Sequence, residues 1–405
     1  MKAFLLAALF SLPCARAASA QGVLTGIDVL EAEDFLSLRG KRVGLITNPT
    51  GKDRQGRSTA LIFAERKDLE LVRIFSPEHG ITGTSEDEGI ASSSITLAGR
   101  MIPVRSLYSG GLAGMRPKTE DLGDLDAVIF DVQDIGVRFY TYLTSMGMAL
   151  EETAKAGVEF IVLDRPDPIG GEILEGPVLK DLSMRKETST AYYPVPIRHG
   201  MSAGEIALMY NEEVRHPRLR VVKLQGWSRK QWYDQTGLPW TPPSPNIPDL
   251  DAAALYPGIG LFEASNISVG RGTPIPFGWI GAPWLDAEGA VKRLRKMKIA
   301  GAEFSVQEYT PSKSVFAGKP CRGVRITVKD REKMRPVLVF LGIAETLKAL
   351  HPEEFQWDWK GALHMTGTED LQEHYEEGDF RGLKTFFEKE SERFAEQRKP
   401  FLLYD

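Results

Sequence analysis

Cysteine is scarce in this chain of 405 residues, which has two thiols, Cys14 and Cys321. Cys14 falls in an apolar N-terminal segment that we expect to be removed, so the mature chain cannot form an intramolecular disulfide. That segment is also too short for a membrane-spanning helix, which needs about 20 apolar residues. Stability must therefore come from a packed core, for which 42% hydrophobic residues are sufficient.

Several well-known motifs are also missing. The sequence has no Gly-x-Ser-x-Gly elbow, no P-loop lysine motif and no Gly-x-Gly-x-x-Gly fingerprint, which argues against serine hydrolases, NTPases and classical dinucleotide enzymes. The formal net charge of -5 argues against a general binder of nucleic acids or anionic membranes. There is no internal repeat and no low-complexity segment.

Residues 1–20 have the pattern of a secretory signal peptide. Lys2 provides a positive charge, Phe4 to Leu12 is apolar, and Ala18-Ser19-Ala20 is a small-residue cleavage site. We therefore expect a periplasmic or secreted protein whose mature chain begins near Gln21.

Three buried-strand patterns run directly into polar turns. They are Arg73 to Phe75 before Ser76-Pro77-Glu78-His79-Gly80, Ala127 to Phe130 before Asp131 to Gly136, and Phe160 to Leu163 before Asp164 to Pro168. Ligands of parallel sheets bind at the carboxyl ends of the strands. The pattern therefore predicts one cleft at these strand ends.

Strands alternate with helical patterns from about residue 43 to residue 224, which is typical of a doubly wound parallel sheet in an α/β domain. The expected strands are 42–47, 69–75, 102–107, 127–131, 159–164 and 220–224, and the expected helices are 58–66, 144–156 and 202–214. The proline-rich segment 239–248 predicts a fixed loop packed along the cleft, and 258–283 has the same irregular character. We expect a first domain at 21–283 and a smaller α+β domain at 284–405, with helices near 286–298 and 333–350 and a strand at 323–328.

The chain resembles the exo-β-N-acetylmuramidases, formerly a domain of unknown function, which remove N-acetylmuramic acid from the non-reducing ends of peptidoglycan fragments. The matching segments are 26–28, 45–51, 76–80, 133–142, 164–166, 198–205 and 243–248. The resemblance implies a Rossmann-like fold without the nucleotide site, an active-site cleft between the two domains, and peptidoglycan-derived saccharides or muropeptides as the binding partners. We expect no cofactor, no nucleic acid and no stable membrane insertion.

Glu78 is the expected general acid. Glycosidic cleavage needs a proton for the leaving oxygen, and a partly desolvated carboxyl group retains that proton at neutral pH. By residue chemistry alone, Glu78 could equally cap a helix or pair with a surface arginine, and the resemblance favours catalysis.

Asp134 and Tyr140 are the other predicted catalytic residues. Gly136 allows the loop that carries Asp134 to approach a ligand, whereas one of Asp131 and Asp134 is expected to be structural. Tyr140 could stabilise a cationic transition state, hydrogen-bond a carboxylate, or be a buried aromatic residue. The sequence leaves open whether the second catalytic group is a carboxylate, Tyr140 or the substrate's own acetamido group.

Muramic acid carries a lactyl carboxylate, which an arginine fork binds better than a lysine does. Of the arginines in these segments, which include Arg165 and Arg198, we favour Arg138 or Arg271. His79, His199 and Asn246 complete the predicted substrate-binding set.

Two alternatives remain open. One is a metal-assisted hydrolase that uses Glu78, His79, Asp131, Asp134 and His199, although scattered histidines are weak evidence for zinc and we expect no metal. The other is a non-catalytic periplasmic muropeptide-binding protein, which also has a cleft between domains. The oligomeric state cannot be read from the sequence.

Overall fold

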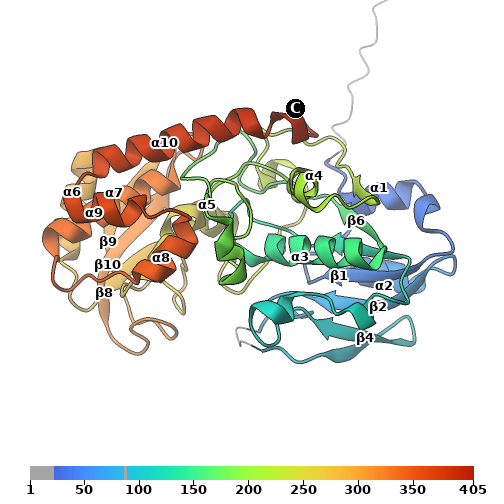
Figure 1. Ribbon diagram of the computed structural model, residues 1–405. Helices are drawn as coiled ribbons and strands as arrows, with labels where there is room; N and C mark the ends of the chain where they lie inside the picture. Colours follow the sequence, from blue (N-terminus) through green and yellow to red (C-terminus); the bar gives the residue numbers. More distant parts are fainter. Residues whose placement is uncertain (1–21, 86–88) are drawn as a thin grey trace, which may run out of the picture.

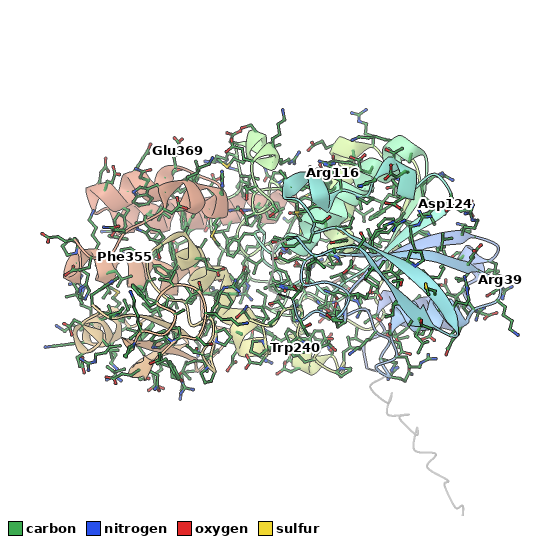
Figure 2. The ribbon with its side chains drawn as sticks, turned by 90° about the horizontal axis from the view of Figure 1, so that it is seen from below. Arg39, Arg116, Asp124, Trp240, Phe355 and Glu369 are labelled. Carbon is green, nitrogen blue, oxygen red and sulfur yellow. The ribbon has the colours of Figure 1, made fainter. Side chains whose placement is uncertain are left out.

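The computed structural model describes residues 22–85 and 89–405, so the predicted signal segment 1–20 lies outside the described residues. The molecule is elongated and contains two sheets (Figure 1), one of seven strands and one of three. Figure 2 shows Arg39 at one end of the molecule, Phe355 toward the other, and Trp240 between them. None of the helices in the described ranges is long and apolar enough to cross a membrane.

The first domain is a doubly wound α/β sheet, as the sequence predicts. Its strand order is β3-β4-β2-β1-β5-β6-β7, and every neighbouring pair except β3 with β4 is parallel. The strands are β1 (Arg42–Thr47), β2 (Glu70–Ser76), β3 (Ser93–Leu97), β4 (Arg100–Ser106), β5 (Ala127–Asp131), β6 (Glu159–Leu163) and β7 (Leu219–Val222). The chain order reverses on either side of β1, between β2 and β5. Such a switch point is where open α/β sheets bind ligands.

Both faces of this sheet are buried because successive side chains of its strands point to opposite faces. Val128 and Phe130 belong to the core beneath α3 (Thr141–Ala156) and α4 (Ala203–Val214), whereas Ala127 and Ile129 belong to the core on the other face. That second core includes residues of α1 (Gly26–Ala32) and α2 (Thr59–Glu65).

The edge strand β3 departs from the predicted all-parallel sheet. It joins β4 through the turn at Ala98 and Gly99, whose φ angles are +47° and +73°. Two central residues with positive φ are typical of a tight antiparallel hairpin. Three of the five β3 residues are exposed, so the strand lacks the continuous apolar run from which the other strands were predicted.

The second domain has an antiparallel sheet in the order β8-β10-β9. Its elements are α5 (Leu250–Ile259), β8 (Trp279–Ala282), α6 (Ala287–Met297), β9 (Ala302–Tyr309), β10 (Cys321–Val328), α7 (Pro336–Leu350), α8 (Trp359–Thr366), α9 (Asp370–Glu377) and α10 (Phe380–Gln397). The expectation that 258–283 is irregular is wrong at β8, which pairs with β10. The boundary at residues 283 and 284 stays a prediction, and α5 and β8 are described with the second domain because α5 packs against α7 and β8 pairs with β10.

Helix α10 runs from the second domain toward the first (Figure 1), where the end of the chain lies near α4. Arg398 follows α10 and donates a 2.8 Å hydrogen bond to the Gly171 carbonyl. The Leu403 amide donates to the Glu205 carboxylate at 2.7 Å. These buried contacts tie the C-terminal segment to the first domain.

The proline-rich segment 239–248 is irregular and packs along the cleft, as predicted. Ser244 and Ile247 line the cavity described below. Tyr142 of α3 donates to the Pro243 carbonyl, and Trp240 donates to the Pro248 carbonyl at 3.0 Å.

Candidate active site

A cavity of about 410 Å³ lies between the two domains at the carboxyl ends of β2, β4 and β5. Residues of both domains line the cavity, so it exists only when the two domains are folded against each other. The first domain contributes Glu78, His79, Tyr108, 139–141, 188–190, Ser244 and Ile247. The second contributes Tyr256, Glu263, Ala264, Arg271, Phe277, Asp358, Gly361, His364 and Met365.

Glu78 follows β2 and is half-buried at the cavity wall. Thr141, the first residue of α3, donates a hydrogen bond from its hydroxyl to Oε2 of Glu78. The contact fixes the carboxyl group beside the first residue of α3. Glu78 therefore lies in the cleft that the sequence predicted, and Thr141 is a partner that the sequence analysis did not identify.

His79 adopts the left-handed conformation with a φ of +68°, and Gly80 follows at +76°. Positive φ is unfavourable for a residue with a side chain and persists where the surroundings enforce it. The His79 Nδ1 atom lies 2.7 Å from the Ser85 carbonyl. Because a carbonyl only accepts, Nδ1 is protonated and donates this hydrogen bond. The turn reverses the chain immediately after Glu78.

Three buried tyrosines surround the base of the cavity. The Tyr140 ring contacts those of Tyr142 and Tyr256 edge to face, at centroid distances of 4.9 and 5.9 Å. Burial raises the pKa of all three phenols, and the nearby Glu78 carboxylate adds to the effect. Each phenol is therefore neutral at physiological pH, so Tyr140 can donate a hydrogen bond but is a poor anionic nucleophile.

Asp134 and His199 lie together beneath the cavity and not on its wall. Nδ1 of His199 accepts from the Met201 amide at 3.2 Å, so its proton is on Nε2, which is 3.5 Å from the Asp134 carboxylate. Asp167 lies beside them, and burial raises the pKa of its carboxyl group to about 7. Asp131, in contrast, is fully buried and pairs with Arg165 at 2.6 Å. Asp134 also accepts a 2.7 Å hydrogen bond from the Gly136 amide, within its own strand-end loop.

The two favoured arginines have different surroundings. Arg138 is fully buried and donates to the backbone carbonyls of Pro177, Val195 and Met365, at 2.9, 2.9 and 2.6 Å. Burial lowers the pKa of its guanidinium to about 9. Arg271 lines the cavity, donates to Glu263, and has 30% of its side chain exposed. The structure therefore places Arg271, and not Arg138, where a ligand can reach it.

Asn246 is buried in the proline-rich loop, next to the cavity-lining Ile247, and its backbone N–H donates to Ser244 Oγ at 3.2 Å. The carboxylates of Glu263 and Asp358 and the imidazole of His364 also line the cavity, and they were not predicted from the sequence. They come from the second domain. No pattern in their local sequence links them to the strand-end motifs.

The five residues of the metal-assisted alternative do not converge. Within residues 22–85 and 89–405, no three acidic, histidine or cysteine side chains are close enough to hold a metal ion together. A positioned carboxyl group, neutral phenols and an arginine around one cavity instead fit a hydrolase of glycosidic bonds.

Comparisons with known proteins agree with this class. Residues 43–251 match the N-terminal family model of exo-beta-N-acetylmuramidase NamZ, and residues 254–404 match its C-terminal model. The chain is 37% identical over 385 residues to the peptidoglycan beta-N-acetylmuramidase NamZ of Bacillus subtilis (strain 168), covering 94% of this chain and 91% of that protein. The chain therefore belongs to the NamZ family of glycoside hydrolases.

Solved structures show the same fold. Two DUF1343 family proteins from Bacteroides fragilis NCTC 9343 superpose with TM-scores of 0.85 and 0.73, at 34% and 29% sequence identity. Each comparison covers 95% of this chain and 99% of the other.

Proposed function

We propose that this chain is an exo-acting β-N-acetylmuramidase that hydrolyses the glycosidic bond of terminal N-acetylmuramic acid in peptidoglycan fragments. The observation that carries the proposal is Glu78, which Thr141 holds at the wall of a cavity shared by two domains. The family membership supports the same reaction, because the similar Bacillus subtilis protein is named as a peptidoglycan β-N-acetylmuramidase.

Glu78 acts as the general acid in this proposal. The Thr141 hydroxyl occupies one carboxyl oxygen, which leaves the other to carry the proton that the leaving oxygen needs. Tyr140 donates a hydrogen bond to the substrate as a neutral phenol. Asp134 and His199 lie 3.5 Å apart and neither lines the cavity, so in this proposal Asp134 does not contact the sugar directly.

The size of the cavity supports exo-action. Small-molecule sites have volumes of about 300–1,000 Å³, and this cavity, at about 410 Å³, is near the lower limit. It suits the end of a glycan strand better than a long internal stretch. Arg271 supplies the cation for the lactyl carboxylate that distinguishes muramic acid from glucosamine.

The proposal is tested by Glu78→Gln, which preserves shape but removes the transferable proton. Turnover of a muramyl-glucosamine disaccharide should fall by about 10² to 10⁴, with little change in substrate binding. A nitrophenyl muramide should be affected less, because its leaving group needs little protonation. Product analysis by chromatography would separate turnover from mere binding.

Glu212→Gln is the matched control, since Glu212 is exposed on α4. Near-normal disaccharide turnover by Glu78→Gln, with an unchanged melting temperature, would rule out Glu78 as the acid. Chelator treatment separates the proposal from the metal-assisted alternative, because only a metal-dependent enzyme would lose turnover.

A further inference from the structure

A second, smaller cavity of about 220 Å³ adjoins the one that holds Glu78. Tyr108, Thr188 and Ser189 line both cavities. Leu112, Met115 and Glu187 belong to the smaller one. The two cavities are therefore neighbouring compartments of one cleft.

The proposed acid lies next to the shared wall. Strands β2 and β4 are parallel neighbours, and Ser76 pairs with Ser106 at their carboxyl ends. Glu78 and Tyr108 are each two residues beyond that pair, and the Leu107 amide still donates to the Ser76 carbonyl at 2.7 Å. Glu78 and Tyr108 both line the larger cavity, and Tyr108 also lines the smaller one. A glycosidic oxygen that receives a proton from Glu78 therefore lies toward the side of the larger cavity that adjoins the smaller one.

Arginine placement indicates which side of the bond each cavity holds. Arg271 and Glu263 line the larger cavity, and neither is among the described residues that line the smaller one. The muramic acid ring, with its lactyl carboxylate toward Arg271, therefore belongs in the larger cavity. The saccharide on the other side of the bond must leave toward Tyr108.

The lining of the smaller cavity suits an N-acetylated sugar. Leu112 and Met115 offer apolar surface to an acetamido methyl group, while the hydroxyls of Thr188 and Ser189 can bond to sugar hydroxyls. Glu187 offers a carboxylate acceptor that is held from α8, by His364 Nε2 at 3.3 Å and Lys360 Nζ at 3.5 Å.

We infer that this cavity is the subsite for the leaving saccharide, an N-acetylhexosamine. The inference rests on the proposed function, because it requires Glu78 to protonate the bond between the two cavities. It also predicts that substrates with a saccharide on the leaving side gain binding energy that simpler muramides do not.

The test compares two substrates in Leu112→Arg, which places a long charged side chain in the smaller cavity. A muramyl-glucosamine disaccharide fills both cavities, whereas a β-muramyl fluoride has no sugar on the leaving side. The variant should lose tenfold or more in kcat/KM for the disaccharide relative to its loss for the fluoride. Leu182→Arg is the matched control, since Leu182 is an exposed leucine elsewhere. Its ratio of kcat/KM for the disaccharide to kcat/KM for the fluoride should equal that of the parent enzyme.

Leu112→Phe, a smaller change, should shift the ratio in the same direction if Leu112→Arg does not fold. Equal losses on both substrates would overturn the inference. A loss confined to substrates that carry a stem peptide would overturn it too, because the cavity would then hold peptide. If the parent enzyme cleaves neither substrate, the proposed function itself fails, and that result is distinct from both.

Discussion

In the proposed function, Arg271 is the residue that distinguishes muramic acid from glucosamine. Its guanidinium donates to Glu263 and lies over the Phe277 ring at 5.3 Å, so its position at the cavity wall is fixed from two sides. A fixed guanidinium binds a carboxylate with two parallel hydrogen bonds, which a lysine cannot reproduce.

Replacing Arg271 with methionine should therefore affect muramic and glucosaminyl substrates differently. Loss of one charge-assisted contact costs about 1.5–3 kcal/mol, or roughly tenfold to a hundredfold in kcat/KM. That loss should appear for a disaccharide ending in N-acetylmuramic acid and be small for one ending in N-acetylglucosamine, which the parent enzyme should cleave poorly. Arg322→Met removes a surface arginine that pairs with Glu288 and is the control. Equal losses of kcat/KM on both substrates would show that Arg271 does not bind the lactyl group.

Asp167 gives the stability of the protein a pH dependence. Burial raises the pKa of this carboxyl group from 3.8 to about 7, and Asp134 adds to the rise while His199 and Arg198 oppose it. The folded protein therefore keeps a proton that the unfolded chain has lost between about pH 4 and 7. The stabilisation is fully present below about pH 4 and is lost as the pH rises through 7.

Asp167→Asn should remove this part of the pH dependence, because an amide resembles the protonated acid. Asp167 Oδ1 accepts from the Ile169 amide at 3.1 Å, and asparagine can keep that bond. The variant should gain stability relative to the parent protein between pH 5 and 8, by up to a few kcal/mol at about 1.4 kcal/mol per pKa unit. Urea unfolding at several pH values measures the difference. Parallel curves for the two proteins would show that Asp167 is ionised throughout. Burial also raises the pKa of Glu175 to about 7, and this group contributes equally to the pH dependence of the parent protein and of the variant.

At the scale of elements, Arg138 joins three segments that are far apart in the chain. It leaves the loop before α3 and donates to carbonyls of Pro177, Val195 and Met365, the last of which lies in α8 of the second domain. An arginine fork reaches several acceptors at once, and a buried carbonyl left without a donor costs about 1–3 kcal/mol.

Arg138→Lys should therefore destabilise the protein, because a single ammonium cannot reach all three carbonyls. The free energy of unfolding should fall by about 2 kcal/mol or more, as measured by denaturant titration. If Arg138 instead binds the lactyl group, KM for muramic substrates should rise while stability stays within about 0.5 kcal/mol of the parent value. The two roles therefore predict opposite patterns in the same pair of measurements.

At the scale of the whole molecule, the cleft between the two domains depends on their fixed position relative to each other. α10 spans the distance between them (Figure 1), and the contacts of Arg398 and Leu403 fix its far end on the first domain. The carboxyl ends of β2 and β4 then face α8 across the cleft. The larger cavity is formed by this arrangement, because residues of both domains line it, whereas the residues that line the smaller cavity all belong to the first domain.

We propose that the molecule works in the periplasm or outside the cell, where peptidoglycan fragments occur. The order of Lys2, the apolar stretch and Ala18-Ser19-Ala20 should direct export and cleavage. N-terminal sequencing of the protein from its native host should find a mature chain that begins near Gln21. An uncleaved chain embedded in the membrane would contradict this prediction.

The sequence by itself determined the sheet and the position of the proposed acid. β1, β5 and β6 are largely apolar runs, β2 ends in the buried Ile74 and Phe75, and polar turns follow these strands; the pattern agrees with a sheet that is buried on both faces. Glu78 was predictable for the same reason, since it directly follows β2. The exposed β3 and the helix α8 carry no such local pattern.

Only the tertiary structure decided which side chains meet. Arg138 and Arg271 are equivalent in sequence terms, but packing surrounds the first with carbonyls and leaves the second at the cavity wall. Glu263 and His364 reach Glu78's cavity from the second domain. Which side chains line the cavity depends on contacts between residues far apart in the chain. Local hydrophobic periodicity contains no information about such contacts.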